Sequence, residues 1–215
     1  MPYRKRYRKK KRSKLPWYER KYTASQLAKK AWKTAKWLKS VVNVEKKICD
    51  TTPNGGVSSS GTVVPITTVA QGDSQIARDG NSIKCTSLLM RGTFTQNPSA
   101  TNSYMRVIYF IDNQQIADTT PGVTDVLQSA SVTSPLNPSS LGRFSIIKDM
   151  QLSFSATGTT AHMREFFMKL QHHIRYNGTA ATDLQKGGVY LLLLSNEATN
   201  TPSYYIENRV RFVDN

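Results

Sequence analysis

The chain of 215 residues is poor in histidine, cysteine and acidic residues, and each shortage excludes a class of protein. Its two cysteines, Cys49 and Cys85, cannot form a disulfide framework and suit a reducing compartment, although a single bridge between them stays open. No apolar run approaches the roughly 18 residues that span a bilayer. The basic N-terminus lacks the apolar core of a secretory signal. We therefore expect neither a membrane span nor a small disulfide-stabilised fold.

Motifs of catalytic and metal sites are also missing. His172 and His173 are adjacent in an alternating segment, so their side chains point to opposite faces and cannot hold one ion together. The chain has no Gly-x-Ser-x-Gly motif and no phosphate-binding loop. We predict no enzyme activity, no catalytic residues, no cofactor and no structural metal site. A divalent ion held at subunit contacts by Asp112, Asp118 and Asp125 is the alternative to solvated loop acids.

The basic excess is confined to one end of the chain. The formal net charge is +16, from 30 Lys and Arg against 14 Asp and Glu. Residues 1–47 contain 18 basic and two acidic residues, whereas residues 48–215 contain 12 of each. A basic tail on a neutral body indicates a polyanionic partner, which is nucleic acid or, less favoured, an anionic membrane surface.

Residues 1–22 have the composition of a disordered arm, because like charges at this density repel one another. Lysine and arginine contact phosphates without reading sequence, and aromatic side chains stack on unpaired bases. The expected phosphate contacts in the arm are Arg4, Lys5, Arg6, Arg8, Lys9, Lys10, Lys11, Arg12 and Lys14, and the expected stacking residues are Tyr3, Tyr7, Trp17 and Tyr18. A basic run of this kind is also typical of a nuclear localisation signal.

Residues 23–43 show the spacing of a basic amphipathic helix. An apolar stripe recurs every three or four residues, at Leu27, Ala31, Ala35, Leu38 and Val42. Lysines occupy most of the remaining surface, with tryptophans beside the stripe; the candidate nucleic-acid contacts are Lys29, Lys30, Lys33 and Lys36, and the stacking candidates are Trp32 and Trp37. Such a helix either packs on the body with a solvated lysine face or lines a nucleic-acid surface, and the two roles are compatible.

From residue 44 the pattern changes to alternation with period two, which predicts strands. We expect eight, at 44–51, 62–69, 83–96, 104–112, 143–154, 163–176, 187–196 and 203–213. The connection 113–142 is long enough to suggest an interaction loop, with a short helix within 123–129. Eight strands without intervening helices predict an all-β sandwich or barrel, and long strands with long loops favour a single antiparallel jelly roll over residues 44–215.

The segment 104–112 is apolar on both alternations, which would leave a sticky face on an isolated sandwich. We expect that second face to be covered by the arm helix or to be used between subunits.

Four segments resemble capsid or coat proteins. Residues 1–12, Met-Pro-Tyr-Arg-Lys-Arg-Tyr-Arg-Lys-Lys-Lys-Arg, resemble the Arg/Tyr-rich arms of circovirus-like capsid proteins. Arg78-Asp79-Gly80-Asn81-Ser82-Ile83 with 88–94 resembles the beginning of a strand in capsids of circular Rep-encoding single-stranded DNA viruses, and 106–112 resembles the strand that follows. The lysine-rich helix is closer to coat proteins of the RNA-containing satellite necrosis viruses, which have a similar layout.

The resemblance implies a structural coat protein that assembles into an icosahedral shell of about sixty copies, with the arm inside on single-stranded nucleic acid. DNA is the expected genome, with RNA as the alternative. Host attachment and nuclear import factors are the other expected partners, and the virion and the host nucleus the expected locations. The rival interpretations are a cellular β-sandwich nucleic-acid-binding protein of ribosomal or chromatin type and a metal-dependent enzyme.

Overall fold

The computed structural model describes residues 22–41, 45–115 and 119–214. The chain divides into two compact units, residues 1–43 and 44–215. The described part of the first unit is one helix, α1 (Ala24–Val41). Within the described residues, no helix combines the length and the apolar character needed to cross a membrane.

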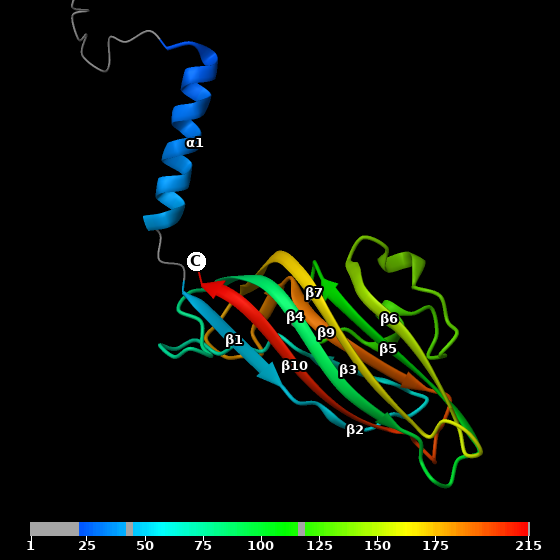
Figure 1. Ribbon diagram of the computed structural model, residues 1–215. Coiled ribbons are helices and arrows are strands. Elements are labelled where there is room, and N and C mark those ends of the chain that lie inside the picture. The colour runs from blue at the N-terminus through cyan, green and yellow to red at the C-terminus, as the bar shows by residue number, and fades with distance from the viewer. Residues whose placement is uncertain (1–21, 42–44, 116–118, 215) are drawn as a thin grey trace, which may run out of the picture. The chain divides into compact units, whose positions relative to one another are not determined.

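The second unit contains two antiparallel sheets (Figure 1). The strands are β1 (Lys46–Thr51), β2 (Asn54–Gly56), β3 (Thr62–Pro65), β4 (Ser82–Thr95), β5 (Asn102–Asp112), β6 (Phe144–Ser155), β7 (Ala161–Tyr176), β8 (Leu184–Lys186), β9 (Gly188–Ser195) and β10 (Ser203–Asp214). Sheet A has the order β1-β10-β4-β7-β8, with β2 also paired to β10, and sheet B has the order β3-β9-β5-β6. Apart from the three-residue strands β2 and β8, consecutive strands lie in different sheets except for β5 and β6, which is the arrangement of a jelly roll.

The all-β jelly-roll prediction is confirmed, and each of the eight expected segments contains a strand. Two three-residue strands, β2 and β8, were not expected, because runs so short carry no measurable alternation. The expected strand at 62–69 ends at Pro65. Beyond it the Thr67 hydroxyl, rather than the backbone, accepts a hydrogen bond from the backbone N–H of Val189.

The core lies between the two sheets, and a buried polar contact links their inner faces. The Tyr109 hydroxyl on β5 donates to Oδ1 of Asn208 on β10 across 2.7 Å. The Tyr109 ring also meets the edge of Phe166 on β7, with ring centres 5.0 Å apart. Burial raises the pKa of the Tyr109 hydroxyl. These contacts show that Tyr109 faces sheet A, so its neighbours Ile108 and Phe110 face the opposite side of sheet B.

That opposite side of sheet B is covered by the chain's own connection between β5 and β6. The connection contains α2 (Val123–Val126) and a 3₁₀ turn, Pro138–Ser140. Val126 and Leu127 are buried in the same apolar cluster as the strands. Phe110 stacks on Tyr190 and meets the edge of Phe144. The expectation that the arm helix or another subunit covers this face is therefore wrong, because residues 119–143 already cover it.

Two arginine–carboxylate pairs fasten this connection to sheet B. Arg106 on β5 binds Asp149 with two hydrogen bonds and donates to the carbonyls of Val132 and Ser134 in the connection. Arg143, at the end of the connection, binds the fully buried Asp112 with a shortest distance of 2.7 Å. The hydrogen bond to Asp112 raises the pKa of the Arg143 guanidinium.

Candidate nucleic-acid interface

The helix α1 begins at a capping box. The backbone N–H of Gln26 donates to the Thr23 hydroxyl, and the backbone N–H of Thr23 donates to the Gln26 side chain. This reciprocal pair satisfies two donors that would otherwise lack partners at the start of the helix. The cap therefore explains locally why the helix starts at Ala24.

The helix presents a cationic face between two tryptophans. At 3.6 residues per turn, Lys29, Lys33 and Lys36 lie opposite the apolar stripe, and Trp32 and Trp37 flank them on either side. All four candidate lysines of the helix are exposed, and the two tryptophans are 65% and 61% exposed. Large exposed aromatic rings next to cations can stack on bases while the cations bind phosphates.

Two lysines of the helix also contact aromatic rings. The Lys36 ammonium lies 5.4 Å from the centre of the Trp32 ring, one helical turn away. At 3.6 residues per turn, Lys30 lies outside the face formed by Lys29, Lys33 and Lys36. Its ammonium lies 3.7 Å from the centre of the Tyr22 ring. Leu27 and Leu38 of the apolar stripe are 53% and 51% exposed.

The remaining predicted contacts of the arm lie outside the described residues. These are Arg4, Lys5, Arg6, Arg8, Lys9, Lys10, Lys11, Arg12 and Lys14, with the aromatic residues Tyr3, Tyr7, Trp17 and Tyr18. The structure thus brings together only the part of the predicted set that lies on α1.

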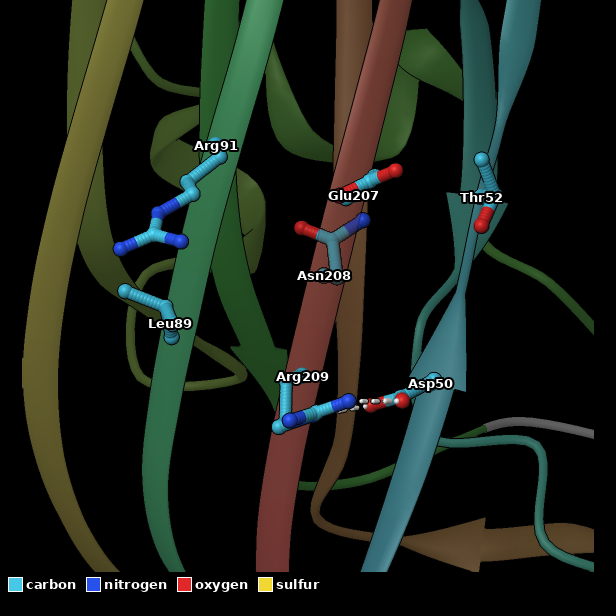
Figure 2. A pocket seen from close by; sticks show the side chains of 7 residues that line it. All are labelled: Asp50, Thr52, Leu89, Arg91, Glu207, Asn208 and Arg209. Carbon is cyan, nitrogen blue, oxygen red and sulfur yellow. Dashed lines mark hydrogen bonds and ion pairs between the residues drawn. The ribbon is translucent and has the colours of Figure 1, made fainter.

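The outer face of sheet A carries a shallow hollow of about 310 Å³ across β1, β10 and β4 (Figure 2). Arg209 and Asp50 face one another across its lower edge, 2.7 Å apart. The hydrogen bond from Arg209 lowers the pKa of the Asp50 carboxyl. Arg91, on its other side, pairs with Glu165 of β7 at 3.0 Å. Because each arginine here has its own carboxylate, this hollow has no surplus positive charge for an anion.

Histidine and acidic side chains are spread through the body. Nε2 of His172 lies 2.9 Å from the carbonyl of Gly187, and burial lowers the pKa of this imidazole. Among the residues that the structure describes, no three His, Cys, Asp or Glu side chains form a metal-binding group. Of the acids considered for a divalent ion, Asp112 is paired to Arg143, Asp125 accepts from the backbone of Gly122, and Asp118 lies outside the described residues.

The two cysteines are free thiols in the structure, which resolves the alternative of a bridge between them. Both are buried in the core. Burial raises the pKa of the Cys49 thiol to about 11 and also raises that of Cys85. Both are therefore in the unreactive protonated form at neutral pH.

Comparison with known proteins identifies the family of a chain with this jelly roll and basic helix. The sequence model of the satellite tobacco necrosis virus coat protein matches residues 20–215. The chain belongs to this coat protein family. The coat protein of Satellite tobacco necrosis virus 2 is 31% identical over 176 residues, covering 79% of this chain and 86% of that protein. The coat protein of Maize white line mosaic Satellite virus is 30% identical over 166 residues, covering 74% and 75%.

The satellite necrosis virus part of the resemblance is thus confirmed for this coat protein, and the circovirus-like part finds no support. The coat protein forms an icosahedral capsid and is a component of the virion, with a structural rather than a catalytic role. The interpretations as a cellular nucleic-acid-binding protein and as an enzyme are set aside.

Solved virus structures show only a remote likeness to the coat protein. Broad bean stain virus is 10% identical, with a TM-score of 0.35 over 76% of this chain and 84% of that chain. Empty particles of cowpea mosaic virus are 7% identical, with the same TM-score and coverage. The jelly-roll assignment therefore depends on the strand order in the two sheets.

Proposed function

We propose that this coat protein packages a single-stranded RNA genome in a shell of about sixty identical copies, with the basic N-terminal unit on the RNA. In this organisation residues 1–22 form a disordered arm, α1 forms the basic helix, and residues 44–215 form the shell. The observation that carries the proposal is the face of α1 on which Lys29, Lys33 and Lys36 lie between two exposed tryptophans.

RNA replaces DNA as the proposed genome. The lysine-rich helix resembles the RNA-containing satellite necrosis viruses, and the family match supports that part of the resemblance. A role of the arm as a nuclear localisation signal has no support from the family and is not included.

The charge of the arm is compatible with a small genome. Residues 1–47 carry a net charge of +16. About sixty copies would bring about a thousand positive charges inside the shell, which neutralise roughly a thousand nucleotides. Small cations neutralise part of any packaged phosphate, so a genome of one to a few thousand nucleotides (order of magnitude) fits this charge.

The genome type is tested on purified particles. Nucleic acid extracted from them is expected to be degraded by RNase and to resist DNase. DNase-sensitive nucleic acid would return the proposal to a DNA genome, and particles that contain no nucleic acid would contradict packaging.

The helix is tested with the double variant Lys33→Gln/Lys36→Gln in the full-length chain. Glutamine has nearly the helix propensity of lysine, so the helix should persist while two charges are lost. For a labelled oligouridylate, the slope of log affinity against log salt should fall by about 1.4, since each lost phosphate contact contributes about 0.7 on a single strand. The matched control, Lys148→Gln/Arg164→Gln, removes two exposed charges from the body. Equal slopes in the two variants would contradict the role of α1.

A further inference from the structure

The neutral body is not uniform in charge. Among residues 45–115 and 119–214, five basic side chains form ion pairs with carboxylates, namely Lys47, Arg91, Arg106, Arg143 and Arg209. Arg78 is fully buried and donates to carbonyl and amide oxygens. Eight basic residues of these ranges remain, and six of them lie on one half of the outer face of sheet A.

We define these six as the cationic half: Lys46, Lys84, Lys169, Arg175, Lys186 and Arg211. The strand register places them together. Arg211 and Lys169 both lie opposite Ser87 of β4, on either side of it, and Lys84 lies opposite Val213 and His173. Five of the six are exposed, and Lys84 is half-buried. Their neighbours along the strands, such as Ile83, Ile174 and Phe212, are buried, which sets the outward direction of the six.

Two of these cations are direct cross-strand partners. Arg175 of β7 pairs with Lys186 of β8 in the antiparallel register. Like charges opposite one another destabilise a sheet in the absence of a counter-ion. A polyanion lying over the pair would remove that cost.

Three acidic residues close to this half in the sequence are already paired with a lysine. Glu45, Asp79 and Asp214 all lie within 4.0 Å of the buried Lys47 ammonium, on the inward side of β1. Their proximity raises the pKa of Lys47, chiefly through the hydrogen bond to Asp79. In the other half of the face, Arg91 and Arg209 have their own carboxylates. Among the described residues, none of the six cations lies within ion-pair distance of a carboxylate.

We infer that the cationic half is a second nucleic-acid-binding surface, one that binds phosphates without stacking on bases. Lys46 follows the last residue of α1 by only five positions, so the basic character of the N-terminal unit continues in the sequence into the sheet. The large exposed apolar side chains of this face, Met163, Phe167 and Tyr205, lie in the half with paired charges. Binding on the cationic half is therefore indifferent to base sequence. The inference rests on the proposed packaging function and adds a second contact to it.

The test is the full-length double variant Lys169→Gln/Arg211→Gln, compared with the same control, Lys148→Gln/Arg164→Gln. All four side chains are exposed, and thermal unfolding of each variant verifies that the fold is kept. With a labelled oligouridylate, the salt slope should fall by about 1.4 in the first variant and by much less in the control.

Two results would overturn the inference while leaving packaging intact. One is a salt slope as steep as that of the wild type in both double variants. The other is normal RNA binding by Lys169→Gln/Arg211→Gln together with failed particle assembly, which would make this half a contact between copies. If the affinity of the wild-type chain for RNA did not depend on salt concentration, the proposed function itself would be overturned.

Discussion

The guanidinium carbon of Arg78 lies 4.1 Å from the centre of the Tyr176 ring, at a point where two loops of the body meet. Arg78 is fully buried, and no carboxylate among the described residues pairs with it. Instead it donates to the carbonyls of Val69, Gly80, Gly178 and Ala180 and to the side chain of Asn81. The Tyr176 hydroxyl in turn donates to the carbonyl of Thr67. One arginine therefore joins the segment before β4 to the turn after β7.

Replacing Arg78 by methionine should lower the free energy of unfolding by about 3 kcal/mol or more, because several buried carbonyls lose their donor at once. Urea unfolding of the variant measures the loss. Lysine at this position keeps the charge but cannot reach five acceptors, so Arg78→Lys should fall between the wild type and Arg78→Met. A methionine variant as stable as the wild type would mean that water replaces the lost donors.

Truncating Arg143 should loosen the connection between β5 and β6. The Asp112 carboxylate is wholly buried, so Arg143→Ala leaves it without its charged partner, at a cost of about 3 kcal/mol or more. Limited proteolysis should then cut within 113–142 before it cuts elsewhere. The matched control is Arg91→Ala, whose partner Glu165 is exposed and whose loss should cost less than about 1 kcal/mol. Equal losses in the two variants would show that burial of Asp112 does not matter.

Replacing Trp32 or Trp37 by leucine should weaken binding of single-stranded RNA by about 1–3 kcal/mol if each ring stacks on one base. Stacking involves no phosphate, so the salt slope should stay unchanged, in contrast to the lysine variants. Phenylalanine at the same position should restore most of the affinity. A changed slope, or no rescue by phenylalanine, would assign the tryptophans to helix packing instead of RNA binding.

The body should lose stability as the pH falls below about 6.5, the usual pKa of an unfolded histidine. Burial lowers the pKa of His172 in the folded state, so the unfolded chain takes up a proton at a higher pH than the native chain does. Stability is full above the unfolded pKa and falls as the pH drops toward the folded one. Urea midpoints at several pH values should decline less steeply for His172→Gln than for the exposed control His173→Gln.

Much of the fold could be predicted from the sequence because alternation along a strand directly reflects which side chains face the core. The positions of β6, β7 and β10 followed from it, whereas β9 was predicted from its continuous apolar run. Alternation did not predict what covers the outer face of sheet B. Buried side chains such as Phe110 and Tyr190 are expected there whether a loop, a helix or another subunit packs on them. The folded structure shows that residues 119–143 cover this face.

For a similar reason, the sequence predicted the basic helix of the candidate site but not the cationic half of sheet A. The excess charge of the first 47 residues is visible in a count, and the spacing of Lys29, Lys33 and Lys36 places them on one helical face. A count of charged residues does not reveal the cationic half of sheet A, because the net charge of residues 48–215 is zero. Its residues come from five strands, and only the pairing register places Lys169 and Arg211 on the two sides of Ser87.

The connection between β5 and β6 also determines where the coat protein can carry a foreign peptide. The connection 113–142 is the longest and so the obvious place for an insertion. Its buried side chains and arginine pairs, however, pack it against sheet B, and an insertion would disrupt that packing. The turn between β6 and β7 is shorter but better suited, because residues 156–160 are all exposed and Ser155 and Thr159 close its base with a 3.0 Å backbone hydrogen bond. Exposed turns of this kind tolerate insertion, so this turn is a display site that the subunit offers.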